Sequence, residues 1–336
     1  MRKIAGIASV LLFIMLFIGP QSTSAAGSAW VVIDAENGRI LQGENEHQPL
    51  PIASLTKMWT AYTFLELKSD SEETIISSEA ATAEGSSIYL EPGTTMQTTD
   101  LLYGLMLRSG NDAAHALAEH AGGSLEGFVY LMNEKAQRHG LENTYFTNPS
   151  GLHDERHLSS AYDTAKMLYY GMKNPDFRKI ATTKNHPFEN ENGKNSWENK
   201  HKLILSEPSA IAGKTGFTKA AGRTLATYFE KDGKSVIVVT LNNGDDWKMH
   251  KQLSQQVFSE YQNYTVAKKG QYQIFPHMTA TVDKPIKLLV SKEEKKQLSN
   301  VLQIPQTEQE QKKGYWSIYL NTEPIKTVAV EIKTEK

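Results

Sequence analysis

The chain has 336 residues, enough for about two domains, and its 39% apolar and 22% charged residues fit a globular protein with a sizeable core. The formal net charge of −2 provides no general attraction to nucleic acid, so we expect no nucleic-acid partner. The complete absence of cysteine excludes disulfides, thiolate metal sites and cysteine nucleophiles.

The N-terminal segment has the pattern of a secretory signal peptide. Arg2 and Lys3 precede an apolar run over residues 4–18, and small residues follow as far as Ala26. A membrane anchor is the alternative, but the run is shorter than the ~20 residues that a transmembrane helix needs. We therefore expect residues 1–26 to be removed on export. Their loss takes two basic side chains and changes the net charge from −2 to −4.

The region that follows predicts a hairpin and then a series of helices. Two apolar runs around an Asn-Gly turn signal predict a β-hairpin over residues 29–45. A helix is expected to begin at Ser54, because apolar residues recur at helical spacing after it. Further helices are predicted over 99–121, with a break at 108–112, over 124–140 with Ser124 as its N-cap, and over 161–173.

From Ala210 the apolar period changes to that of strands. Strands are predicted over 210–218, 222–230 and 235–243, followed by a closing helix over 246–264. Strands at both ends and helices between them predict one antiparallel sheet with an inserted helical region, an α/β (α+β) fold. Residues 265–336 alternate apolar with polar side chains and predict a small all-β domain after a main domain of residues 27–264.

Ser54-Leu-Thr-Lys57 is the first motif that could carry chemistry. Residues three apart at a helix start lie on one face, so the lysine amine can reach the serine hydroxyl and act as its base. The helix N-terminus also supplies N–H groups for a developing oxyanion. The alternative is a serine N-cap followed by an exposed lysine, and it is the better explanation of this motif taken alone.

Two later motifs are equally ambiguous by themselves. Ser109-Gly110-Asn111 lies in the break between two helices, where all three residue types form turns. Lys214-Thr215-Gly216 lies in a predicted strand, where the glycine permits close approach and the lysine and threonine can hold a carboxylate. The alternative for the second is an ordinary edge-strand lysine.

The ordered combination of the three motifs favours chemistry. Ser-x-x-Lys, Ser-x-Asn and Lys-Thr-Gly in this order are typical of serine β-lactamases and penicillin-binding proteins. Together with the stretches PIASLTKMWTA, RSGNDAA, NPSGLHDERHLSSAYD, AGKTGFT and AGRTLAT, the sequence resembles the D-alanyl-D-alanine carboxypeptidases, the low-molecular-mass penicillin-binding proteins. The resemblance covers residues 28–264 strongly and the rest weakly. Gly110 at the middle of its motif fits the carboxypeptidases better than the class A β-lactamases.

This resemblance implies the roles of the catalytic residues. Ser54 would attack the carbonyl of a D-Ala-D-Ala bond, and Lys57 would take its proton. Ser109, with Lys214 near it, would relay a proton toward the leaving amine. The backbone N–H groups of Ser54 and Phe217 would form the oxyanion hole.

The same resemblance implies the substrate contacts and partners. Asn111 would bind an amide of the substrate, and Lys214, Thr215 and Gly216 would form the site for the terminal carboxylate. The substrate would be a peptidoglycan stem peptide ending in D-Ala-D-Ala, with β-lactams as covalent inhibitors and no metal or cofactor. A monomer is expected, and membrane association is left open.

Three other interpretations were weighed. His153 and His157 are spaced as metal ligands could be, but the glutamate of a zinc-peptidase motif is misplaced and the segment predicts a loop. A β-lactamase would share the acylation chemistry and differ in how fast the acyl-enzyme hydrolyses. A wall-binding protein with an inactive site is the non-enzymatic alternative.

Two further features are given structural interpretations. Trp59 and Trp197 are interpreted as core or cleft-wall residues, and the charged cluster at 292–296 is interpreted as a solvated face.

Overall fold

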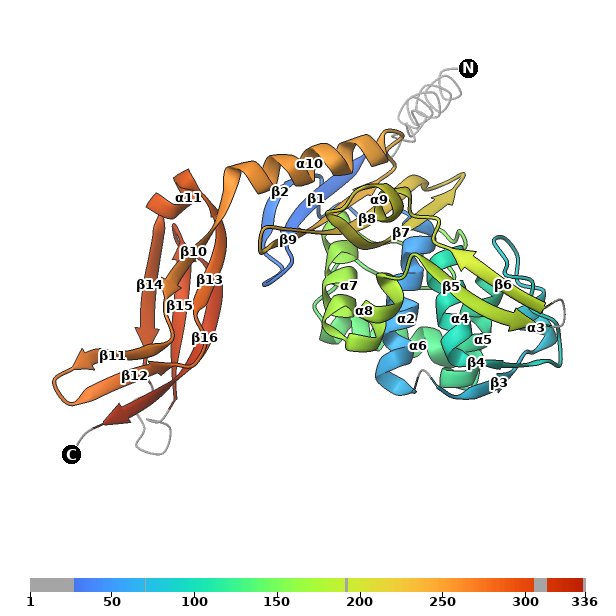
Figure 1. The fold of residues 1–336 in the computed structure, drawn as a ribbon, viewed down its shortest axis with the longest axis horizontal. Helices are drawn as coiled ribbons and strands as arrows, with labels where there is room; N and C mark the ends of the chain where they lie inside the picture. The colour runs from blue at the N-terminus through green and yellow to red at the C-terminus, as the bar shows by residue number, and fades with distance from the viewer. Residues whose placement is uncertain (1–26, 70, 191–192, 305–312, 335–336) are drawn as a thin grey trace, which may run out of the picture.

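The computed structural model describes residues 27–69, 71–190, 193–304 and 313–334. The expected signal segment, 1–26, therefore lies outside the described residues. Figure 1 shows a part that combines helices with a sheet, and a β-rich part that begins where α10 (Asp246–Glu260) ends.

The first part is built around a five-stranded antiparallel sheet with the strand order β2-β1-β9-β8-β7. The hairpin near the N-terminus therefore pairs with strands about 200 residues later, for example Val31 opposite Val239. This confirms the prediction that both ends of the region form one sheet. Its strands are β1 (Ala29–Asp34), β2 (Ile40–Glu44), β7 (Ala210–Thr218), β8 (Gly222–Lys231) and β9 (Lys234–Leu241).

Helices cover both faces of this sheet. Alternate strand residues point to opposite faces, so Val31 packs in the core shared with α2 and α7 while Val32 packs against α10. Both strand faces are apolar because both are buried. Helix α2 (Thr56–Leu67) is buried on all sides from Thr56 to Phe64, which makes it the centre of the larger core.

The region between β2 and β7 holds most of the helices and two small two-stranded sheets. Besides α2, its helical segments are η1 (Ala53–Leu55), α3 (Ser78–Ala81), α4 (Thr98–Tyr103), the π-helical η2 (Gly104–Arg108), α5 (Asn111–Gly122), α6 (Leu125–Arg138), α7 (Ala161–Lys173), α8 (Pro175–Ala181) and α9 (Lys202–Ser206). The small sheets pair β3 (Glu73–Ile75) with β4 (Thr95–Gln97), and β5 (Asn185–Asn190) with β6 (Gly193–Glu198). Among the described residues, none of the helices is long and apolar enough to cross a membrane.

The predicted end of the closing helix is wrong by a few residues. The helix α10 stops at Glu260, and Tyr261 begins β10 (Tyr261–Ala267), which pairs with β13 (Ile286–Ser291). The Tyr261 side chain is buried and its hydroxyl donates to the Leu41 carbonyl at 3.0 Å. That buried contact ties the start of β10 to the central sheet.

The β-rich part contains a second five-stranded sheet and its own apolar core. Its strand order is β11-β12-β16-β15-β14, with β11 (Gly270–Phe275), β12 (Met278–Val282), β14 (Leu298–Gln303), β15 (Lys313–Leu320) and β16 (Glu323–Thr334).

The prediction of a solvated face at 292–296 is wrong in one respect. These residues form a one-turn helix, α11 (Lys292–Lys296), in which Ser291 and Glu294 make a capping box. The lysines are exposed, but Glu294 accepts from the Arg39 guanidinium at 2.7 Å, and Arg39 also donates to the Leu289 carbonyl at 2.6 Å. The acidic residue of this cluster therefore links the β-rich part to the turn between β1 and β2.

Candidate active site

The predicted nucleophile, Ser54, lies in the tight turn η1 directly before α2. The preceding residue, Ala53, has a φ of +50°, a left-handed conformation that is strained for a residue with a Cβ. Hydrogen bonds on both sides hold this turn: Thr224 Oγ1 donates to the Ile52 carbonyl at 3.0 Å, and Thr56 Oγ1 donates to the Ala53 carbonyl at 2.8 Å. The turn presents Ser54 at the surface of an otherwise buried segment.

Lys57 lies one turn into the helix, fully buried, with its Nζ 3.0 Å from Ser54 Oγ. The same nitrogen donates to Asn111 Oδ1 at 2.7 Å and to the Ser150 carbonyl at 2.5 Å. Both of these oxygens can only accept. A neutral amine has two N–H groups and one lone pair, so these two acceptors use both N–H groups and leave the lone pair for the Ser54 hydroxyl.

The electrostatics of the site favour the neutral amine. Burial lowers the pKa of Lys57 well below its usual value, and the cations of Lys214 and Lys200 lower this pKa further. Asp112 is the acid that opposes this shift. A buried lysine with a lowered pKa is the form that can accept a proton from a serine hydroxyl.

Asn111, the first residue of α5, contacts Lys57, and Ser109 lies two residues earlier in the break between η2 and α5. The π-helical turn η2 ends at Ser109, whose φ of +66° is left-handed. Ser109 Oγ is buried and has no hydrogen-bond partner among the described residues. A buried hydroxyl without a partner is costly, so the retention of this group at Ser109 suggests a functional contact.

Both polar atoms of the Asn111 side chain already have hydrogen-bond partners, although its implied role is to bind an amide of the substrate. Its Oδ1 accepts from Lys57, and its Nδ2 donates to the Glu84 carbonyl. The side chain therefore holds Lys57 in this structure, and a substrate amide would have to compete for it.

Sequence reasoning missed Asp112, which follows Asn111 and is fully buried. Its carboxylate accepts from Ser87 Oγ at 2.6 Å, from Ile88 N at 2.9 Å and from Leu90 N at 3.2 Å. These bonds fix the 84–90 loop. The same loop holds Asn111 through two carbonyls: Glu84 O accepts from Asn111 Nδ2, and Ser86 O accepts from the Asn111 backbone N–H at 2.6 Å. The sequence signal was an acidic residue in the first turn of a helix, which is too common to single out.

The Lys-Thr-Gly motif lies on β7, the edge strand of the central sheet, which contacts η1. A Cβ on Gly216 would lie 3.0 Å from the backbone nitrogen of Ser54, so the glycine allows the strand to approach the nucleophile. Lys214 is two residues away on the same strand face and is buried. Burial, aided by Lys200, lowers the pKa of Lys214 to about 7, and its Nζ donates to the Thr215 carbonyl at 2.9 Å.

Two further features of this strand bear on the site. Phe217, which follows Gly216, has a side chain that is 66% exposed. The edge position of β7 leaves alternate backbone groups unpaired by β8, as an oxyanion hole or a strand-like substrate requires. The cations that act on Lys57 are those of Lys214 and Lys200, and a positive charge here suits a substrate with a carboxylate.

The loop over residues 147–157 also contacts the site, next to Lys57 and helix α2. It supplies the Ser150 carbonyl to Lys57, and the Pro149 carbonyl accepts from Thr60 Oγ1 at 2.6 Å. His157, weighed above as a metal ligand, is buried, and both of its ring nitrogens have hydrogen-bond partners. Among the described residues, no group of three or more histidine, aspartate or glutamate side chains is placed to hold a metal ion.

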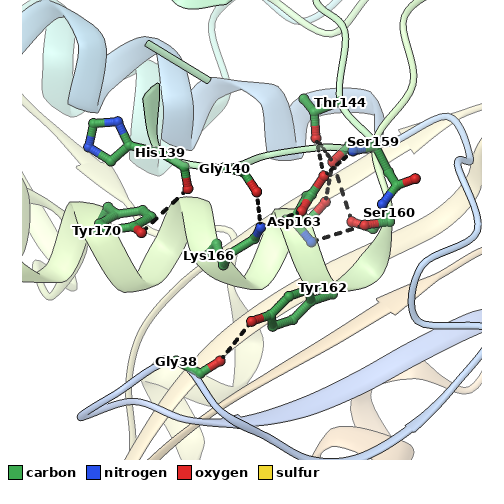
Figure 2. Close-up of polar contacts among 12 residues, drawn as sticks. Gly38, His139, Gly140, Thr144, Ser159, Ser160, Tyr162, Asp163, Lys166 and Tyr170 are labelled. Carbon is green, nitrogen blue, oxygen red and sulfur yellow. Dashed lines mark hydrogen bonds and ion pairs between the residues drawn. The ribbon is translucent and has the colours of Figure 1, made fainter. Parts of the chain in front are cut away.

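The downstream end of this loop is anchored at the start of α7 (Figure 2). Ser160 caps the helix by accepting from Asp163 N at 3.0 Å. The Asp163 carboxylate accepts from Thr144 Oγ1 at 3.0 Å and pairs with Lys166 at 2.8 Å, and Lys166 also donates to the Gly140 carbonyl. Buried polar groups with several partners make this end of the loop rigid.

Comparison with known proteins places these observations in context. A family model described as D-alanyl-D-alanine carboxypeptidase matches residues 18–245. D-alanyl-D-alanine carboxypeptidase DacF of Bacillus subtilis is 34% identical over 250 residues, which are 72% of this chain and 64% of that protein. D-alanyl-D-alanine carboxypeptidase DacC of Escherichia coli is 33% identical over 261 residues, again 72% and 64%. The chain thus spans slightly less than two thirds of the length of these relatives.

Solved structures share the architecture. A D-alanyl-D-alanine carboxypeptidase of Mycobacterium tuberculosis matches with a TM-score of 0.66 and 29% identity, over 69% of this chain and 90% of that one. Penicillin binding protein 5 of Haemophilus influenzae matches with a TM-score of 0.76, over 91% of this chain and 96% of that one. At 24% identity, the second match shows the fold alone. The predicted fold class, including the all-β C-terminal region, is confirmed.

Proposed function

The chain belongs to the family of D-alanyl-D-alanine carboxypeptidases, serine-type peptidases, and from this premise we propose that it removes the terminal D-alanine from peptidoglycan stem peptides through an acyl-enzyme on Ser54. The observation that carries the proposal is the environment of the Lys57 amine. Its two acceptors and its lowered pKa leave a lone pair for the Ser54 hydroxyl.

In the proposed acylation step, Ser54 Oγ transfers its proton to Lys57 Nζ and bonds to the carbonyl carbon between the two D-alanines. The oxyanion is stabilised by the backbone N–H groups of Ser54 and Phe217, each donor being worth roughly 3–4 kcal/mol of barrier. The C–N bond then breaks, and the proton held by Lys57 passes to the leaving amine through the unpartnered hydroxyl of Ser109, which makes Lys57 neutral again. Water next hydrolyses the ester, releasing the shortened peptide and restoring Ser54.

The leaving D-alanine is held by its carboxylate. Lys214 and Thr215 would bind this group beside Gly216, and an anion next to Lys214 would raise the pKa of its amine from about 7 and favour the cation. Asn111 would bind an amide of the stem peptide by exchanging one of its present partners. No step in this sequence of events requires a metal or cofactor.

The test is release of free D-alanine from a peptide ending in D-Ala-D-Ala. The wild type should release it, whereas Ser54→Ala and Lys57→Ala should release none above background. Ser124→Ala is a matched control, because Ser124 also begins a helix but only caps Gly127 N. Release by Ser54→Ala at the wild-type rate, or none from the wild type, would disprove the proposal.

The same chemistry supports acylation by penicillins, in which the strained amide takes the place of the D-Ala-D-Ala bond. We also propose that the protein is exported by residues 1–26 and acts as a monomer in cell-wall peptidoglycan maturation. Residues 27–264 would form the catalytic domain and residues 265–336 a separate β domain, with strand β10 (Tyr261–Ala267) running across this boundary.

A further inference from the structure

The 147–157 loop presses directly on the turn that presents Ser54. Gly151 has a φ of +82°, and a Cβ at this position would lie 2.0 Å from the Ala53 carbonyl oxygen. The neighbouring Ser150 carbonyl accepts from Lys57 Nζ at 2.5 Å. One loop therefore contacts both the residue before the nucleophile and the amine that acts on it.

His157 connects this loop to the turn through hydrogen bonds whose directions can be assigned. Thr147 N–H donates to His157 Nδ1 at 3.1 Å, so Nδ1 is the acceptor and the ring proton is on Nε2. Nε2 lies 2.8 Å from Thr56 Oγ1. The Thr56 hydroxyl already donates its proton to the Ala53 carbonyl at 2.8 Å, so Oγ1 accepts from Nε2–H.

The result is a continuous chain of three hydrogen bonds, from Thr147 through His157 and Thr56 to the Ala53 carbonyl. It fits only one tautomer of a neutral imidazole, because a proton on Nδ1 would face the Thr147 N–H. Burial keeps the ring neutral by lowering the pKa of His157 to about 4. The titratable groups that act on it are Asp154, His153 and Lys57.

The chain of hydrogen bonds ends at the carbonyl of Ala53, a residue with a strained backbone. Ala53 occupies a left-handed conformation that is strained for a residue with a Cβ and persists only where surrounding contacts over-determine it. Its carbonyl is fixed by Thr56, and Thr56 is fixed by His157. Release of this carbonyl would let the turn relax and move Ser54 relative to Lys57.

We propose that His157 is a positioning residue for acylation: through Thr56 it holds the strained Ala53 carbonyl and so keeps Ser54 Oγ within reach of Lys57 Nζ. The inference rests on the proposed function, because it assumes that Ser54 is the nucleophile. His157 does not touch the reacting atoms, and its effect is on the geometry of the residues that do.

The test compares two replacements of His157 in the full chain. His157→Leu fills the space without hydrogen bonds, whereas His157→Gln offers an amide oxygen to Thr147 and an amide N–H to Thr56. The measured quantity is the second-order rate constant of acylation by a fluorescent penicillin at pH 7.5, together with the unfolding temperature. We expect His157→Leu to slow acylation roughly 10- to 100-fold, as a small misplacement of reacting groups does, and His157→Gln to restore most of the rate.

Thr56→Val provides a second, independent variant if His157→Leu does not fold. It removes the middle of the chain and should slow acylation to a similar extent. The inference is overturned if folded His157→Leu or Thr56→Val acylates within twofold of the wild type, or if His157→Gln is as slow as His157→Leu. If the wild type itself is not acylated at Ser54, the proposed function fails first, so the two failures are distinguishable.

Discussion

Replacing Asp112 with asparagine tests how the site is held together. All three hydrogen bonds from the 84–90 loop go to Oδ2 of the carboxylate, while Oδ1 accepts from Ala113 N at 2.9 Å. An amide oxygen in the place of Oδ2 can keep the loop bonds, but they become bonds to a neutral group, and the amide nitrogen then faces the Ala113 N–H. Hydrogen bonds to a charged group are worth about 1.5–3 kcal/mol each, and those to a neutral group about 0.5–1.5 kcal/mol. Weakening three bonds by about 1 kcal/mol each and losing the bond to Ala113 gives about 4–6 kcal/mol, and because part of the loop can rehydrate we expect about 3 kcal/mol in the free energy of unfolding. The loop also supplies both carbonyls that hold Asn111, so acylation should slow roughly 10- to 100-fold.

The matched control is Glu126→Gln. Glu126 occupies the equivalent position in the first turn of α6 and is exposed, so this variant loses the same helix-terminal charge without the loop bonds. Urea denaturation measures the stability of both variants, and stopped-flow acylation by a fluorescent penicillin measures the rate. The reasoning is refuted if Asp112→Asn loses no more stability than Glu126→Gln, or if its acylation rate is unchanged.

Three further predictions use other features of the site. Ser109→Ala removes a buried hydroxyl that lacks a partner in the described structure, so the unfolding temperature should stay the same or rise while D-alanine release falls roughly 100-fold or more; a lower unfolding temperature with normal release would contradict this. Gly151→Ala should lower the free energy of unfolding by about 2–4 kcal/mol and abolish acylation, because its Cβ would clash with the Ala53 carbonyl. The control is Gly93→Ala: Gly93 has a φ of +81° but open space around it, so this variant should lose only the stability that the left-handed backbone costs an alanine. An equal loss of stability in the two variants would rule out the clash with Ala53. His157 and His201 are buried, and burial lowers their pKa values to about 4 and about 3, so below about pH 6.5 the unfolded chain binds protons that the folded chain does not. These two histidines should therefore lower the free energy of unfolding by about 5 kcal/mol between pH 7 and pH 4.5, and His250, whose pKa burial also lowers, should add to this fall; urea midpoints that do not change over this range would contradict the assignment.

The three motifs and the strands of the central sheet could be identified from the sequence alone, because each depends on a local pattern of residues. The N-cap at Ser124, for example, was predicted from residue type and spacing, and its side chain accepts from Gly127 N at 3.0 Å. The end of α10 was predicted wrongly because Tyr261 continues the helical period of Val257 and Phe258 while it also suits a strand.

Features that depend on tertiary contacts could not be predicted in this way. The β5–β6 hairpin has only two large apolar residues, Phe188 and Trp197, and an Asn-Gly dipeptide at 192–193 was the single signal for it. Asp112 acts on Leu90, 22 residues away in the chain, and His157 acts on Thr56, 101 residues away, so their residue types alone say nothing about their roles. The left-handed conformation of Ala53 is likewise imposed by contacts and not by its own preference.

The most direct test of the central claim is the site of covalent modification by benzylpenicillin. The purified wild type should gain the mass of one penicilloyl group, and peptide mapping should place this group on Ser54. Ser54→Ala should gain no mass under the same conditions. An adduct on another residue, or an adduct of equal yield in Ser54→Ala, would contradict the assignment of Ser54 as the nucleophile.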